Sequence, residues 1–277
     1  MLLTNNLSTW FYPESASSDW TLLYTLTTVG QRTIWTSPTD WNEYGLFIVG
    51  GGASGHSEFS KSKSGTGGNG GVVLSQIVQV TNPEFELVVG AGGAATAAGT
   101  NKASNEGKSS YIIVDGVTYT AAGGLGKNTT DMTANTKVVG SGMGGTGIGN
   151  TDHTPYFYRI SSSDTNGRMG ENGLPNPFDP NDLLLYGPGG GAGISAYYYR
   201  SSSCPSPGYF AGGEGHVSDP TICGGKGGYG ANNASTNAGS AATVYGGGGG
   251  GGAFSGNHTY GSGGAGFQGI IKIYGRN

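Results

Sequence analysis

The chain has 277 residues, of which 58 are glycine, 10% are aromatic and only 11% are charged, and its net charge is −4. Disordered chains combine low hydrophobicity with high charge, so this composition favours a folded protein over a solvated linker. The 13 basic residues are spread thinly and no apolar run approaches the ~20 residues of a membrane helix, which excludes a nucleic-acid-binding stripe and membrane insertion.

The N-terminal sequence MLLTNNLSTW has neither a positive region nor a long apolar core. We therefore expect no signal peptide and synthesis in the cytoplasm. No stretch has helical periodicity, because Gly, Ser, Thr and Asn interrupt every window. Short β-prone runs are clear instead, at Trp20–Thr28, Gly45–Val49, Val72–Val80, Phe85–Val89, Tyr111–Val114, Val117–Ala121 and Gly269–Tyr274.

Asp115 and Gly116 separate two of these runs. Both residue types tolerate the positive φ of a two-residue turn, so the pair predicts a tight β-hairpin.

About ten glycine tracts lie between and after the strands. They are Gly50–Gly55, Gly65–Gly71, Gly90–Gly99, Gly123–Gly126, Gly140–Gly149, Gly187–Gly193, Gly212–Gly215, Gly224–Gly230, Gly246–Gly252 and Gly261–Gly269. Their uneven spacing excludes a fixed-repeat solenoid and collagen.

Ordering glycine costs backbone entropy and buries no side chain in return. Polyglycine II helices, which are extended three-fold helices of the polyproline II type, have outward N–H and C=O groups that can bond neighbouring helices. Without a Cβ atom they can also pack very closely. We therefore predict a bundle of such helices clamped by a β-domain. Its structural glycines include Gly144, Gly145, Gly190, Gly248 and Gly249.

Four segments, taken in order, resemble the glycine-rich domains of phage tail receptor-binding proteins and adhesins. They are Thr33–Pro38 leading to Leu46–Gly52, Gly68–Gly93, Gly107–Gly124, and Gly263–Tyr274. The likeness spans roughly residues 31–275 in pattern. More distantly, the strand-rich first half is similar to a TNF-like domain joined to a glycine-rich domain. The resemblance implies an all-β fold, a jelly-roll or TNF-like β-sandwich that carries packed polyglycine II helices.

The same resemblance implies a location in the virion tail, or alternatively outside the cell. It implies a host surface protein or glycan as receptor, and other tail or fibre proteins as partners of the N-terminal segment. A homo-oligomer such as a trimer fits this setting. We expect an attachment segment over residues 1–30 and a glycine-rich sandwich over 31–277, with inserted loops at about 151–185 and 194–211.

Motifs for catalysis are weak. Gly140–Gly145 satisfies G-x-G-x-x-G, but the residues after it do not favour a helix. Gly107-Lys108-Ser109 lacks the first glycine of a phosphate-binding loop. The four histidines, His56, His153, His216 and His258, are scattered and are expected at the surface or in loops. We predict no enzyme activity, no cofactor and no metal.

Aromatic residues gather in two loops and at the N-terminus. The loop residues Tyr156, Phe157, Tyr158, Arg159, Tyr197, Tyr198, Tyr199, Arg200, Tyr209 and Phe210 form the candidate receptor-binding set. Rigid aromatics beside arginine are typical of binding loops, although these loops could simply cap the glycine bundle. Trp35 is expected in the sandwich core. Trp10 and Trp20 fit either the core or a docking surface.

Cys204 and Cys223 are separated by 19 positions and can pair in an oxidising location; two reduced thiols are an equal alternative. The leading functional hypothesis is a non-catalytic adhesin of a phage tail fibre or tail tip. A structural virion or extracellular fibre subunit is the second, and an ice-binding protein is the third.

Overall fold

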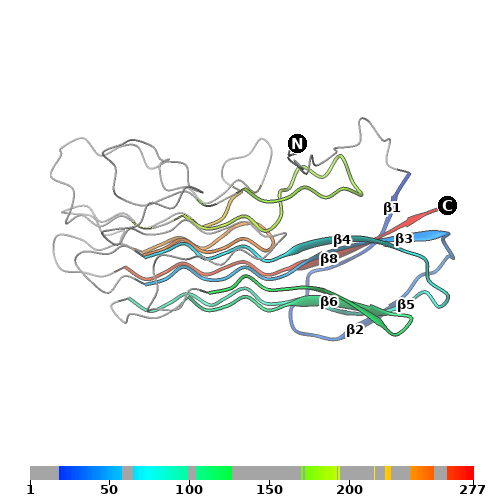
Figure 1. The fold of residues 1–277 in the computed structure, drawn as a ribbon, viewed down its shortest axis with the longest axis horizontal. Helices are drawn as coiled ribbons and strands as arrows, with labels where there is room; N and C mark the ends of the chain where they lie inside the picture. Colours follow the sequence, from blue (N-terminus) through cyan, green and yellow to red (C-terminus); the bar gives the residue numbers. More distant parts are fainter. Residues whose placement is uncertain are drawn as a thin grey trace, which may run out of the picture.

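The computed structural model describes residues 19–57, 65–98, 104–126, 170, 172–191, 193, 215, 222–225, 238–252 and 261–277. These residues form a two-sheet β-sandwich that continues into a bundle of extended glycine-rich segments (Figure 1). The described residues contain no α-helix. The predicted all-β fold is therefore confirmed for this part of the chain.

The sandwich has two antiparallel four-stranded sheets. The first has the order β1 (Thr21–Leu26), β8 (Ile270–Arg276), β3 (Glu43–Val49) and β4 (Val73–Val78). The second has the order β2 (Thr33–Thr36), β5 (Glu84–Val88), β6 (Ser110–Val114) and β7 (Val117–Ala121). Each run predicted as a strand overlaps one of these strands. Only the resemblance pointed to β2, because its four residues are too few to stand out.

The sandwich core follows from the two-residue alternation of side chains along each strand. Tyr44, Leu46 and Ile48 of β3 point inward and pack with residues of β5, β6 and β8, whereas Phe47 and Val49 point to the outer face of the first sheet. That outer face is also buried, because Phe178 and Tyr186 of the segment 172–186 pack on it. Strand β3 is therefore apolar on both faces.

The hairpin between β6 and β7 turns at Asp115 and Gly116, with φ values of 48° and 74°. This confirms the predicted two-residue turn. The Asp115 carboxylate also accepts hydrogen bonds from the backbone amides of Thr81 and Asn82, at 2.7 and 3.1 Å. The turn is thereby fastened to the β4–β5 connection.

Hydrogen bonds along residues 50–57 define a polyglycine II helix. Successive backbone amides donate to three different neighbours in rotation, at 2.8–3.0 Å. Gly50, Ala53 and His56 donate to segment 65–72; Gly51 and Ser54 donate to 104–109; Gly52 and Gly55 donate to 261–269. A period of three is that of the polyproline II type of helix. The tract predicted as a polyglycine II helix therefore has its hydrogen-bond signature.

Segment 50–57 lies at the centre of six neighbours. Its carbonyl groups accept hydrogen bonds from Gly93, Gly124 and Gly249, which belong to segments 90–98, 122–126 and 246–252. Segment 246–252 is surrounded in the same way. Its neighbours are 50–57, 65–71, 187–191, 222–225, 238–242 and 261–269. In the described part of the chain, two central helices therefore share neighbours and are ringed by eight other segments.

Strands run directly into these helices. β3, β5 and β7 continue outward as 50–57, 90–98 and 122–126, while 65–71, 104–109 and 261–269 return into β4, β6 and β8 (Figure 1). At this junction the buried Ser110 hydroxyl donates to the Val49 carbonyl at 2.6 Å and accepts from the Gly90 amide at 2.9 Å. The side chain bridges the two sheets where strand geometry changes to helix geometry.

His56 corrects one expectation. It was expected at the surface or in a loop, but its side chain is buried, with 1% of its area exposed. The reason is that the three-fold backbone pattern does not end with the glycines: the His56 amide donates to Thr66 and its carbonyl accepts from Gly252. His153, His216 and His258 lie outside the described residues.

Candidate functional site

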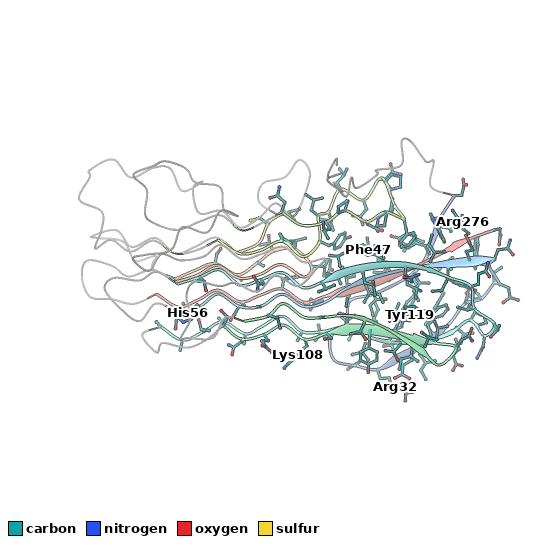
Figure 2. The ribbon with its side chains drawn as sticks, viewed as in Figure 1. Arg32, Phe47, His56, Lys108, Tyr119 and Arg276 are labelled. Atoms are coloured by element: carbon teal, nitrogen blue, oxygen red, sulfur yellow. The ribbon has the colours of Figure 1, made fainter. Side chains whose placement is uncertain are left out.

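The end of the bundle remote from the sandwich is the candidate site, here called the bundle tip. The described residues that form it are His56, Ser57, Gly65, Thr66, Ala97, Ala98, Ser104, Gly126, Gly193, Gly252 and Gly261. Hydrogen bonds tie these ends together, for example from Gly65 to Gly252 and from Gly193 to Gly65, both at 2.9 Å. Figure 2 shows His56 at this end and Arg276 at the other.

The described chain ends lie opposite the bundle tip. Thr21 of β1 pairs with Gly275 of β8 at the outer end of the sandwich, so the first and last described residues lie there. Trp20 packs edge-on against Phe178 at a centroid distance of 5.0 Å, and the Arg276 guanidinium lies 4.4 Å from the centre of the Trp20 ring. Trp20 is thus packed on the sandwich and half-buried. Trp10 lies outside the described residues.

The glycine residues keep the bundle rigid because their neighbours leave no space for a side chain. A Cβ atom on Gly190, Gly248 or Gly249 would lie 2.0–2.1 Å from a backbone carbonyl oxygen of an adjacent helix. Real Cβ contacts below 3.0 Å essentially do not occur. The other two glycines singled out from the sequence, Gly144 and Gly145, lie outside the described residues.

Two glycines at the start of a helix are needed for a second reason. Gly187 and Gly246 have φ values of 69° and 74°, in the left-handed region that residues with a Cβ rarely adopt. Gly246 begins the central helix 246–252, and Gly187 begins its neighbour 187–191.

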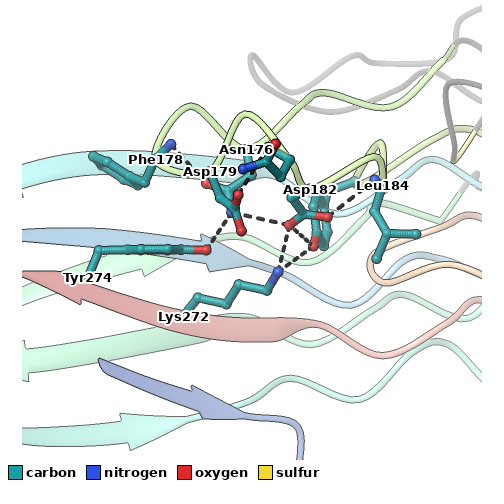
Figure 3. A network of polar contacts seen from close by, with 9 residues as sticks. Asn176, Phe178, Asp179, Asp182, Leu184, Lys272 and Tyr274 are labelled. Atoms are coloured by element: carbon teal, nitrogen blue, oxygen red, sulfur yellow. Dashed lines mark hydrogen bonds and ion pairs between the residues drawn. The ribbon is translucent and has the colours of Figure 1, made fainter. Parts of the chain in front are cut away.

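A polar network fastens the segment 172–186 to the first sheet (Figure 3). The Asp182 carboxylate accepts from Lys272 Nζ at 2.6 Å, from the Tyr186 hydroxyl at 2.7 Å and from Asn176 Nδ2 at 3.3 Å. Asn176 Nδ2 also donates to the Tyr274 hydroxyl at 2.7 Å. The ion pair is nearly buried, with 13% of the Lys272 and 8% of the Asp182 side chain exposed.

The electrostatics of this network stabilise charge on Asp182. Burial alone would raise the pKa of Asp182, but hydrogen bonds from Lys272 and Tyr186 outweigh it and hold this pKa below its usual value. Burial raises the pKa of the Tyr186 and Tyr274 hydroxyls, so both stay protonated. The network holds segment 172–186 against the first sheet, and its polar atoms form hydrogen bonds with one another.

Sequence reasoning missed this network. Asn176, Asp182 and Lys272 are separated by up to 96 positions, and no spacing rule joins them. The one available signal was Lys272, a charged residue inside the otherwise apolar run Ile270–Tyr274, which needs a partner if its strand is covered.

The predicted receptor-binding residues all lie outside the described residues. These are Tyr156, Phe157, Tyr158, Arg159, Tyr197, Tyr198, Tyr199, Arg200, Tyr209 and Phe210. In the sequence, Tyr197 is four residues after Gly193 of the bundle tip.

Cys223 is buried, and its backbone exchanges hydrogen bonds with the Thr243 hydroxyl. Cys204 lies outside the described residues, so the disulfide stays a prediction. Among the residues described, His, Cys, Asp and Glu form no group of three or more that could hold a metal ion. In the same part of the chain no helix is long and apolar enough to cross a membrane.

Comparison with known proteins agrees with the glycine bundle. The profile of the family described as "Glycine-rich domain" matches residues 27–276, which is most of the chain. The chain belongs to the glycine-rich domain family. No curated protein matches it. The family match includes both sheets apart from β1, and every glycine helix described above.

Proposed function

We propose that this glycine-rich domain protein is a non-catalytic receptor-binding protein, an adhesin of a phage tail fibre or tail tip. It attaches to its assembly through the sandwich end and meets a host surface protein or glycan at the bundle tip. The observation that carries the proposal is the opposite placement of two features. The first and last described residues lie at the outer end of the sandwich, and the described helix ends Gly126 and Gly193, which precede two of the aromatic loops in the sequence, lie at the bundle tip.

The bundle suits such a role because it is a stiff spacer. Helix 50–57 spans about 22 Å at a rise of ~3.1 Å per residue. Its backbone groups bond neighbouring helices, so little hydrogen-bonding capacity remains for a partner. Binding energy must then come from side chains at the tip. Tyrosine and arginine are the residue types that most often dominate interfaces, at ~2 kcal/mol or more each when central.

The test is to remove the aromatic side chains and measure attachment to host cells. One variant changes Tyr197, Tyr198, Tyr199 and Arg200 to Ser, and a second changes Tyr156, Tyr158 and Arg159 to Ser. A matched control changes Arg32 and Ile34, which are exposed on the sandwich, to Ser. Melting temperature is checked first for all three.

The proposal predicts that at least one loop variant folds like the parent but loses adsorption, while the sandwich control adsorbs normally. If both loop variants fold and adsorb like the parent, the loops are not the receptor site. A structural role as a fibre subunit then takes its place.

A further inference from the structure

The two sheets have four edge strands, and two of them carry features that block pairing with another chain. An edge strand has unpaired N–H and C=O groups, which proteins usually protect with bulges, charges, proline or short length. The register of β1 shifts between Leu22 and Tyr24, which marks a bulge or irregularity. β2 has only four residues, and Arg32 and Pro38 lie just outside it.

Within the part of the chain that the structure describes, strand β4 has none of these protections. Its sequence, VLSQIV, is uncharged and contains no proline, and its six residues pair with β3 without a shift in register. Ser75, Gln76 and Ile77 are exposed, and 46% of the Ile77 side chain area is open to solvent. β7, with the sequence VTYTA, is also an uncharged edge strand. It belongs to the second sheet and contacts β4 of the first.

The open side of β4 can be read from one hydrogen bond. The Ile77 carbonyl accepts from the side-chain amide of its own neighbour Gln76, at 3.0 Å, so it faces away from β3. In an antiparallel pair the backbone groups of alternate residues share a side. The N–H and C=O groups of Val73 and Ser75 therefore face outward with those of Ile77.

This edge is complementary to itself. When two β4 strands pair antiparallel about a two-fold axis at Ser75, Ile77 of each copy lies opposite Val73 of the other. Both residues lie on the outer face of the first sheet, so an exposed isoleucine packs against a valine. No charges of like sign meet, and the same axis brings the two β7 edges towards each other.

We infer that the protein forms a two-fold dimer in which β4 pairs with β4 of a second copy and the first sheet becomes continuous across both. The stacked edges are ~20 Å long and roughly 20 Å deep, or about 400 Å², which is below the ~800 Å² per partner of a standard stable interface. The dimer is therefore weak and depends on concentration. This geometry gives two subunits, whereas the phage-tail resemblance suggested a trimer.

The experiment is sedimentation velocity of the full chain over a series from low to high micromolar concentration. The parent should change from monomer to dimer. Ile77→Lys should stay monomeric, because it places two like charges in the new sheet. Ile34→Lys is the matched control, an equally simple change at an isoleucine that is 57% exposed on edge strand β2, and it should dimerise like the parent.

Ser75→Pro is a second variant, since it removes an outward N–H without removing a bond to β3. Amide exchange in the parent needs no variant: Ser75 and Ile77 should exchange more slowly in the concentrated sample. A parent that is monomeric throughout, a trimer or larger polymer, or a folded Ile77→Lys variant that dimerises like the parent would each overturn the inference.

Discussion

Gly248→Ala adds one methyl group at the centre of the bundle, and its effect can be worked out from the contacts. The new Cβ would lie 2.0 Å from the Gly68 carbonyl oxygen. The two helices would have to separate by about 1.4 Å, the difference between 2.0 Å and the 3.4 Å at which ordinary contact begins. Three hydrogen bonds join them, from Gly65, Gly68 and Gly71, at 2.8–2.9 Å.

Such a separation breaks at least the two bonds nearest residue 248. A buried backbone group left without a partner costs ~1–3 kcal/mol, so the loss is about 2–6 kcal/mol. Alanine also lowers the conformational entropy of the unfolded chain, which stabilises the folded state by ~0.4–1 kcal/mol. The expected net loss in free energy of unfolding is therefore about 1–6 kcal/mol, against ~5–15 kcal/mol for a typical domain.

Urea unfolding followed by tyrosine and tryptophan fluorescence measures this loss. Ala95→Val is the control, because residue 95 is exposed on the outer helix 90–98 and its added methyl groups point into solvent. It should change stability by no more than ~0.5 kcal/mol. If Gly248→Ala has an equally small effect, helix 246–252 is not packed as described and the reasoning fails.

Three further predictions follow. Ser110→Ala removes the hydroxyl between Val49 and Gly90 and should lower the free energy of unfolding by ~1–3 kcal/mol in the same assay; no change would contradict the junction described. The pKa of Asp182 is lower in the folded protein than the ~3.9 of an unfolded chain. Its contribution to stability is therefore complete above pH ~3.9 and is lost as the pH falls through the pKa of the folded state. The parent should thus lose more stability on acidification than Asp182→Asn. Parallel pH profiles would rule this out. Cys204 and Cys223 should appear as one linked peptide by non-reducing mass spectrometry of protein held in an oxidising environment, a closure worth roughly 3 kcal/mol in the chain-entropy model; two free thiols there would contradict it.

Much of the sandwich could be predicted because strands carry local signals. The β-branched and aromatic run Tyr111–Val114 and the turn chemistry of Asp115-Gly116 depend only on neighbours along the chain. The polyglycine II bundle could be predicted as a class of structure, since extended glycine needs outside partners for its N–H and C=O groups. Which helices become central could not be predicted. Segments 50–57 and 246–252 meet through hydrogen bonds such as that from Gly249 to Ala53, which join residues far apart in the sequence.

The polar network around Asp182 and the bundle tip both contain features that the sequence alone did not predict. Nothing local marks Asp182 as the partner of Lys272, because their contact depends on the segment 172–186 folding back over β8. His56 was misplaced because side-chain type suggested a surface, whereas its backbone continues the helix of the glycines before it. In both cases the tertiary arrangement overrides the local preference.

Amide hydrogen exchange tests the central claim of this account most directly, because it measures the glycine backbone itself. If helices 50–57 and 246–252 form the core of a hydrogen-bonded bundle, the amides of Gly51–Gly55 and Gly248–Gly252 should be protected as strongly as those of β3 and β8. The amide of Ala95, on the exposed side of helix 90–98, should exchange quickly and serves as the internal reference. Rapid exchange throughout both glycine segments, with protection confined to the strands, would contradict the bundle and with it the proposed rigid support for the binding loops.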